Sequence, residues 1–402
     1  MPPSTVTFAG AYTSPSAEPM FSPSGAMLTA SPMILFDGKT LTDDNTSELW
    51  GNTGTGDFTF TQNRMVMGVD AGEYCIRRSQ TVMPYYAGYP TQFEATLFDF
   101  HTEAGVTKRV GMFSSSAVAP HSGSLDGFFL EDDGTTKRLV AYNNGTEIFN
   151  VPYADWLGRQ AFEAYDDLPE YDWSKFTVLM FDFLWLGGAV LRVWIRLGSR
   201  WQLLHAVSCC GSTDALIFQS PQQPARYEIR SNGGTGSFTA VCCQVSVSGD
   251  VTRNGRLRCS VNTAGVPANS SGTNYVLQAI RKSTTYRDVA IEIESISSAR
   301  SGGATDTGIL MLLRNPILSS ALSYAAYGKV ERAVGTGQTV TDLGTILLAA
   351  PAADFAQEPL VGNYVRWMTQ SITDTADQYV LSYQAITTNQ TVYGVLSYKE
   401  HA

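Results

Sequence analysis

The sequence contains few of the residues from which enzyme active sites and metal centres are usually built. Four of its 402 residues are histidine, and no two of them stand at the spacing of metal ligands. Neither the G-x-S-x-G motif of hydrolases nor a G-x-x-x-x-G-K phosphate-binding loop occurs. We therefore predict a protein that is not an enzyme, with no catalytic residue, no bound metal and no cofactor.

Charged residues are also scarce, at 16% of the chain against roughly 25% in an average soluble domain. Acidic residues outnumber basic ones by 37 to 27, which gives a formal net charge of −10 and predicts no nucleic-acid partner. No run approaches the ~18 consecutive apolar residues that span a bilayer, so we predict no membrane insertion. The first twenty residues lack the basic and apolar regions of a secretory signal, and none is expected.

The six cysteines form no C-x-x-C motif. Two pairs are vicinal, Cys209-Cys210 and Cys242-Cys243, and neighbouring side chains on a strand point to opposite faces. We predict buried free thiols, because free cysteine is among the most buried residue types.

Residues 1–46 are rich in proline, serine and alanine, with prolines at positions 2, 3, 15, 19, 23 and 32. Proline at this density excludes a long helix or a central strand. We predict an extended arm, either a linker or a segment that orders against a neighbouring subunit.

From residue 47 the pattern changes to short alternating apolar runs separated by turn residues. Asp133-Gly134 and Asn144-Gly145 are strong hairpin signals and together predict a three-strand meander. Residues 178–186 are apolar on both faces apart from Asp182, which predicts a central buried strand, and 191–197 predict a half-exposed one. Residues 153–168 are the best, though weak, helix candidate. These features predict a lectin-like β-sandwich over residues 47–250.

A glycine-rich stretch at 249–274 is interpreted as a domain boundary. Strand-like runs recur beyond it every 10–20 residues, and predict a second β-sandwich or jelly-roll domain over residues 251–402. The fold class is thus predicted to be all-β, with two antiparallel β-sandwich or jelly-roll-like domains and an extended N-terminal arm.

Aromatic residues make up 11% of the chain and gather in two stretches. One is a tyrosine-rich loop bounded by prolines, and the other is an acidic loop that also contains aromatic side chains. Tyrosine and tryptophan offer rigid contact area with a polar tip, as binding surfaces require. The alternative is that both loops merely anchor the edge of a sandwich. The candidate binding residues are Tyr85, Tyr86, Tyr89, Tyr165, Tyr171 and Trp173.

Two groups of acidic residues suggest more specific chemistry. Residues 131–133, Glu-Asp-Asp, could bind calcium through clustered oxygens, but they also lie where a hairpin tip needs such residues for its turn. Glu292 and Glu294 stand two apart on one predicted strand and could form the acid pair of a glycosidase. The structural alternative is that both glutamates lie on the solvent face of a strand whose isoleucines face the core. We favour the structural alternative for both groups.

Several segments resemble a family of uncharacterised virion structural proteins of tailed bacteriophages. The resemblance is carried by Tyr89-Pro90, Arg109-Val110-Gly111, Asp126 to Glu131, Phe181 to Gly187, Leu191 to Trp194 and Val395 to Glu400. It covers residues 80–230 well and the C-terminal part loosely. It implies a structural component of the virus particle, on the tail, the baseplate or the capsid exterior, and it supplies no catalytic residues.

Three functions follow, in order of preference. The first is a non-enzymatic virion protein on the particle exterior that assembles as a homo-oligomer with other virion proteins as partners. The second is an adhesin on the tail that binds a host-surface glycan through its tyrosine- and tryptophan-rich loops. The third is a glycan depolymerase.

Overall fold

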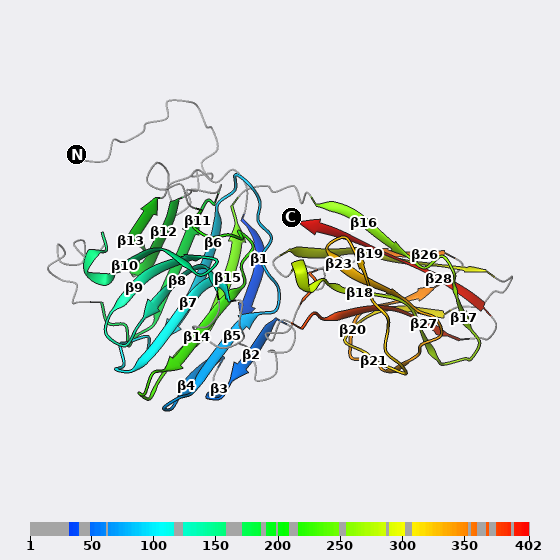
Figure 1. The fold of residues 1–402 in the computed structure, drawn as a ribbon, viewed down its shortest axis with the longest axis horizontal. Helices are drawn as coiled ribbons and strands as arrows, with labels where there is room; N and C mark the ends of the chain where they lie inside the picture. The colour runs from blue at the N-terminus through cyan, green and yellow to red at the C-terminus, as the bar shows by residue number, and fades with distance from the viewer. Residues whose placement is uncertain are drawn as a thin grey trace, which may run out of the picture.

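The structure is a computed structural model of the whole chain, and it forms two lobes side by side (Figure 1). The residues that it describes are 32–39, 49–61, 63–115, 124–157, 171–185, 190–197, 200–208, 216–248, 255–286, 289–301, 308–352, 355–359, 367–369, 375–386 and 390–401. Within them the chain is almost entirely β-strand, and the strands pair antiparallel. The predicted all-β fold class is confirmed.

The first lobe is built from two sheets. The eight-stranded sheet has the order β13-β12-β11-β6-β15-β4-β3, and β1 pairs with β15. Its strands are β1 (Met33–Lys39), β3 (Asp57–Thr61), β4 (Arg64–Val69), β6 (Thr91–Phe98), β11 (Thr177–Phe183), β12 (Val190–Leu197), β13 (Arg200–Ser208) and β15 (Gly236–Val247). The seven-stranded sheet, in the order β10-β9-β8-β7-β14-β5-β2, contains β2 (Trp50–Gly54), β5 (Tyr74–Ser79), β7 (Val106–Ser115), β8 (Leu125–Asp132), β9 (Lys137–Asn143), β10 (Thr146–Pro152) and β14 (Ala225–Ser231).

The second lobe also pairs two main sheets. The five-stranded sheet contains β16 (Arg256–Val261), β17 (Val266–Ala268), β19 (Ala290–Ser301), β26 (Phe355–Pro359) and β28 (Gln390–His401). The six-stranded sheet contains β18 (Asn274–Lys282), β20 (Gly308–Arg314), β22 (Ala325–Tyr327), β23 (Val330–Val334), β25 (Thr345–Ala352) and β27 (Gln378–Ala385). The short strands β21 (Ile317–Leu318) and β24 (Val340–Asp342) form a separate pair. Each lobe also has one 3-10 turn: η1 (Tyr153–Asp155) follows β10 in the first lobe, and η2 (Thr284–Tyr286) follows β18 in the second.

Each lobe has its own core between its two sheets. In the first lobe, Phe128 of the seven-stranded sheet and Phe181 of the eight-stranded sheet are fully buried, with ring centroids 5.4 Å apart. Burying a phenylalanine contributes about 1.5–3 kcal/mol, so such contacts hold the layers together. In the second lobe, Ile293 and Tyr398 meet Leu310 and other buried side chains of the six-stranded sheet. Both lobes are therefore sandwiches.

The predicted meander is present as β8, β9 and β10. Its turns contain Gly134 and Asn144-Gly145, all with positive φ, as tight hairpin turns require. The predicted buried strand is β11, which lies inside its sheet between β12 and β6, and the half-exposed strand is β12.

Two details of the sequence interpretation need correction. Residues 33–39 belong to strand β1, not to an extended arm, because the apolar segment that follows Pro32 is free of proline and pairs with β15. Residues 1–31 and 40–46 of the predicted arm lie outside the described residues. The helix candidate begins as η1 instead of an α-helix, and residues 158–168 are likewise outside the described part. No helix in the described part is long and apolar enough to cross a membrane.

The cysteines are not uniformly buried. Cys75 and Cys243 are buried free thiols, as predicted, but Cys242 and Cys259 are exposed. Adjacent residues of β15 point to opposite faces, which explains the contrast within the vicinal pair. Cys259 lies on β16 at the edge of its sheet, and Cys209 and Cys210 are outside the described residues.

Candidate ligand-binding site

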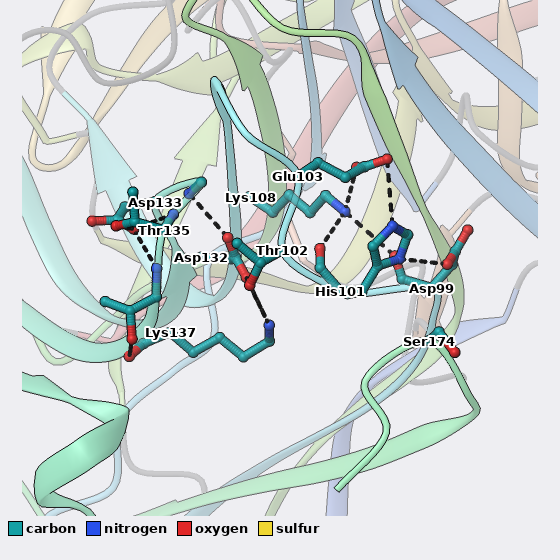
Figure 2. A network of polar contacts seen from close by, with 12 residues as sticks. Asp99, His101, Thr102, Glu103, Lys108, Asp132, Asp133, Thr135, Lys137 and Ser174 are labelled. Carbon is teal, nitrogen blue, oxygen red and sulfur yellow. Dashed lines mark hydrogen bonds and ion pairs between the residues drawn. The ribbon is translucent and has the colours of Figure 1, made fainter. Parts of the chain in front are cut away.

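A pocket of about 500 Å³ lies at one end of the first lobe, where four connecting segments meet. These segments are the β6–β7 turn, the β8–β9 hairpin tip, η1, and the stretch that precedes β11. The residues that line the pocket are His101, Thr102, Thr135, Thr136, Lys137, Tyr153, Tyr171, Asp172 and Trp173. Figure 2 shows the polar side chains on the turn and the hairpin.

Two lining residues, Thr102 and Lys137, are held by the Asp132 carboxylate, which is completely buried beside the pocket. Its oxygens accept hydrogen bonds from Lys137 Nζ at 2.7 Å, Thr102 Oγ1 at 2.6 Å and Gly134 N at 3.0 Å (Figure 2). Lys137 also donates to Thr102 Oγ1 at 3.0 Å, and its ammonium lies 5.2 Å from the ring centre of Trp173. The buried charge is therefore paired and hydrogen-bonded, as burial of a carboxylate requires.

The Asp133 carboxylate shapes the hairpin tip. It accepts hydrogen bonds from the backbone N–H of Thr135 and Thr136, at 2.9 and 2.8 Å, and from Thr135 Oγ1 at 2.6 Å. Arg138 forms an ion pair with the same carboxylate. Glu131 is held by Arg109 at 2.6 Å. The three acidic residues considered for calcium thus serve the hairpin and its ion pairs.

His101, which lines the pocket, lies between two acids. Its Nδ1 lies 2.7 Å from Asp99 Oδ1, and its Nε2 lies 3.6 Å from Glu103 Oε1 (Figure 2). The buried Lys108 ammonium pairs with Glu103 at 2.6 Å and donates to the His101 carbonyl oxygen at 2.8 Å. Burial lowers the pKa of Lys108, while Glu103 opposes that shift. This network fixes the β6–β7 turn, and with it the imidazole.

Aromatic rings also line the pocket. Tyr171 and Trp173 meet edge to face, with centroids 4.9 Å apart, and the Trp156 ring supports Trp173 from behind at 6.4 Å. The Tyr171 hydroxyl donates to Thr177 Oγ1 at 3.0 Å, which orients the phenol. Tyr153 completes this set of rings. Together the rings offer flat apolar surface held by packing and by hydrogen bonds.

Asp172 is the one carboxylate among the described residues that line the pocket. It accepts hydrogen bonds from Ser174 Oγ at 2.6 Å and from Ser174 N at 2.9 Å. These donors stabilise the ionised form and lower the pKa of the Asp172 carboxyl. Asp172 is therefore an ionised hydrogen-bond acceptor at neutral and mildly acidic pH.

The six binding residues proposed from the sequence fall in three places. Tyr171 and Trp173 line the pocket, whereas Tyr165 lies outside the described residues. Tyr85 is half-buried with its ring edge-on to another aromatic, Trp185, and Tyr89 is exposed.

Tyr86 is buried where the two lobes meet. Its ring lies 6.4 Å from that of His401, at the end of the last strand of the second lobe (Figure 1). Gln222, from the first lobe, donates to the His401 carbonyl oxygen at 2.8 Å and accepts from Ala290 N at 2.7 Å. The prolines around Tyr86 therefore belong to a loop that helps to join the lobes.

Glu292 and Glu294 do not form a pair facing a common cleft. Glu292 is fully buried and lies 3.1 Å from His401 Nε2, so its predicted alternative place on a solvent face is also wrong. Glu294 pairs with Lys399 at 2.6 Å. The register of β19 against β28 shifts between Ile293 and Ser295, which makes Glu294 the extra residue of a bulge and breaks the simple alternation.

In the described residues, no group of three or more His, Cys, Asp or Glu side chains is arranged to hold a metal ion. The sequence interpretation identified the aromatic residues Tyr171 and Trp173 but missed the polar half of the pocket: His101, Thr102, Thr135, Thr136 and Lys137. The Asp-Gly hairpin signal could have indicated residues 135–137, because it places them at a strand end. No local signal indicates that residues 101 and 102 lie beside them.

No family model and no curated protein matches the chain. Solved structures with a similar arrangement include the carbohydrate recognition domain of Emp47p, at 12% identity over 55% of this chain and 97% of that domain, with a TM-score of 0.36. A legume lectin-like domain from Entamoeba histolytica matches at 12% identity over 54% and 98%, with a TM-score of 0.34. A carbohydrate esterase from the Shiga toxin-encoding bacteriophage phi24B matches at 12% identity over 54% and 100%, with a TM-score of 0.32. Likenesses of this size do not bear on function.

Proposed function

We propose that the chain is a glycan-binding protein and that the pocket at the end of its first lobe holds the sugar. The observation that carries the proposal is the lining, in which the aromatic side chains of Tyr171 and Trp173 share one pocket with hydroxyl, imidazole and ammonium groups. A sugar ring has apolar C–H faces and hydroxyl edges, so recognition needs both kinds of group. The volume, about 500 Å³, falls in the range of about 300–1,000 Å³ typical of ligand pockets.

The lining favours binding over cleavage. Glycoside hydrolysis by the common mechanisms needs two carboxyl groups on either side of the scissile bond. The described lining supplies Asp172 alone, and the nearby Asp132 is saturated by three hydrogen-bond donors. We therefore propose a lectin-like role in which Asp172 accepts hydrogen bonds from sugar hydroxyls.

We further propose that this lobe is displayed on the exterior of a bacteriophage particle, on the tail, the baseplate or the capsid, as part of a homo-oligomer. The support is the resemblance of residues 80–230 to virion proteins of tailed phages, together with the weakly charged composition. Immunogold labelling of gradient-purified particles tests this placement. Absence of the protein from the particles would refute the proposal.

The glycan proposal is tested with a glycan array followed by calorimetry on the best ligand, using Asp172→Asn. We expect at least a tenfold loss of affinity, about 1.4 kcal/mol. The fall in melting temperature should be small, because Asp172 is exposed and asparagine keeps an acceptor oxygen for Ser174. The matched control is Asp342→Asn in the second lobe, where an exposed aspartate accepts a similar turn hydrogen bond from Gly344 N at 2.9 Å. Equal affinity in both variants, or no binding by the wild type, would refute the proposal. Release of sugar fragments would instead indicate a depolymerase.

A further inference from the structure

The lysines nearest to the first-lobe pocket are already paired with acids. Lys137 Nζ lies 2.7 Å from an oxygen of Asp132. Lys108 Nζ lies 2.6 Å from an oxygen of Glu103. Neither lysine side chain is more than 7% exposed. An anionic ligand would therefore meet cations whose charge is balanced by a neighbouring carboxylate, and it would gain little from them.

Asp172 is placed differently, because one of its oxygens is open to a ligand. Both hydrogen bonds from Ser174 go to the same oxygen, Oδ1, and the Asp172 side chain is 56% exposed. Among the described residues, the other oxygen, Oδ2, forms one ion pair, with Lys175 Nζ at 3.8 Å. The Lys175 side chain is 73% exposed, and exposed ion pairs contribute little. A ligand cation can therefore replace this lysine at Oδ2.

The charges next to the pocket add up to a slight negative excess. His101 lies between two carboxylates, with 2.7 Å from its Nδ1 to Asp99 and 3.6 Å from its Nε2 to Glu103 (Figure 2). With a neutral imidazole, the described groups named so far comprise four carboxylates and three lysines: Asp99, Glu103, Asp132 and Asp172, and Lys108, Lys137 and Lys175. A cationic ligand would correct this imbalance, whereas an anionic one would increase it.

The aromatic residues favour a ligand of the same charge. Tyr153 and Tyr171 are half-buried and line the pocket together with Asp172. The face of an aromatic ring attracts an ammonium group through its negative quadrupole. The protein uses this attraction itself, since the Lys137 ammonium lies 5.2 Å from the ring centre of Trp173. Tyrosine rings and an accessible carboxylate in one pocket are therefore suited to an ammonium group that is attached to an apolar C–H framework.

We propose that the sugar bound in this pocket carries a positively charged amino group. This inference rests on the proposed function and specifies the class of glycan. The ammonium group donates to Asp172 Oδ2, and the sugar hydroxyls are left for the exposed Thr102 and Thr135. A hydrogen bond between ions is stronger than one between neutral groups, so an amino sugar should bind more tightly than its neutral counterpart.

The test compares glucosamine with glucose, N-acetylglucosamine and glucuronate, by NMR titration of the full chain at about pH 6, where the amine is protonated. We expect glucosamine to bind at least tenfold more tightly than each of the other three sugars. In Asp172→Asn its preference over glucose should fall below about threefold, because the amide keeps an acceptor oxygen but has no charge. The matched control is Asp342→Asn, which changes an exposed aspartate in a similar turn of the second lobe and should keep the full preference.

Lys175→Met provides a second check that separates charge from hydrogen bonding. This variant removes the lysine that competes for Asp172 Oδ2. Its affinity for glucosamine should rise by about twofold, as expected for the loss of an exposed ion pair, and its affinity for glucose should not change. A fall in glucosamine affinity would contradict the proposed contact.

The remaining outcomes separate this inference from the proposed function. Equal binding of glucosamine and glucose by the wild type would overturn the amino-sugar inference and leave the glycan site in place. Tighter binding of glucuronate would mean that the lysines determine specificity, and a full preference in Asp172→Asn would mean that the ammonium group lies elsewhere. If none of the four sugars binds but the glycan array identifies another ligand, this inference alone fails. If the array is also negative, the proposed function fails with it.

Discussion

The ion pair between Asp132 and Lys137 should be the most sensitive point of the candidate glycan pocket. Asp132 is completely buried and the Lys137 side chain is 7% exposed, so neither charge is well solvated. Replacing Lys137 by methionine keeps most of the side-chain volume but leaves the carboxylate without its cation. Breaking a buried pair in this way costs about 3–5 kcal/mol. A domain of this size should lose roughly 10 °C in melting temperature, at about 2–4 °C per kcal/mol.

The assay is urea unfolding followed by tryptophan fluorescence, because Trp173 lies 5.2 Å from the Lys137 ammonium and reports on this region. The double variant Lys137→Met/Asp132→Asn should recover most of the loss, since it removes the uncompensated charge. Lys175→Met is the control, because that lysine pairs with Asp172 in an exposed setting and should cost less than about 1 kcal/mol. A loss below about 1 kcal/mol for Lys137→Met, or a double variant as unstable as the single one, would refute the reasoning.

Three further predictions concern other parts of the chain. A methyl group on Gly308 would lie 2.1 Å from the ring of Tyr383. Gly308→Ala should therefore destabilise the second lobe by about 2 kcal/mol or more. A melting temperature equal to that of the wild type would contradict this close approach. Peptide mapping after brief iodoacetamide treatment should find Cys242 alkylated well before Cys243. The reason is that Cys243 is buried and that burial strongly raises the pKa of its thiol. Equal labelling of the two cysteines would contradict this prediction. Burial lowers the pKa of His205, so the folded state binds a proton at this imidazole less readily than the unfolded state does. The free energy of unfolding should therefore fall as the pH drops below about 6.5, the ordinary histidine value. His205→Gln should reduce this pH dependence, and an unchanged slope in calorimetric unfolding at pH 5–7 would show that His205 does not contribute.

Local sequence signals were sufficient to predict many of the strands, but they did not predict which distant segments are in contact. The meander of β8, β9 and β10 followed from two dipeptides, because Asp-Gly and Asn-Gly supply the positive φ that such turns need. β11 followed from its continuous apolar run. β1 was missed because the prolines before it dominate the composition of residues 1–46, while its pairing partner β15 lies some 200 residues away in the chain.

The joint between the lobes illustrates the same limit. Glu292 looks like any exposed strand glutamate in the sequence, and its burial depends on His401, at the other end of the second lobe's sequence. Gln222 contributes one side-chain amide that bridges two strands of the second lobe, a role for which glutamine carries no local signal. Tyr86 was expected in a recognition loop, and the structure places it in this joint. The positions of these three side chains can therefore be assigned only from the tertiary structure.

The acidic residues that suggested calcium have the turn role that the sequence analysis favoured, together with ion pairs that the sequence could not show. Because Asp132 and Asp133 are saturated by donors from the protein, the backbone of the hairpin tip is fixed before any ligand arrives. Trp173 is fixed in the same way, by Lys137 on one side and Trp156 on another. A site held in this manner loses little conformational entropy on binding. The ordering of side chains and loops is one of the costs that reduce affinity. Variants that loosen the hairpin should therefore weaken glycan affinity even when they touch no residue that contacts the sugar.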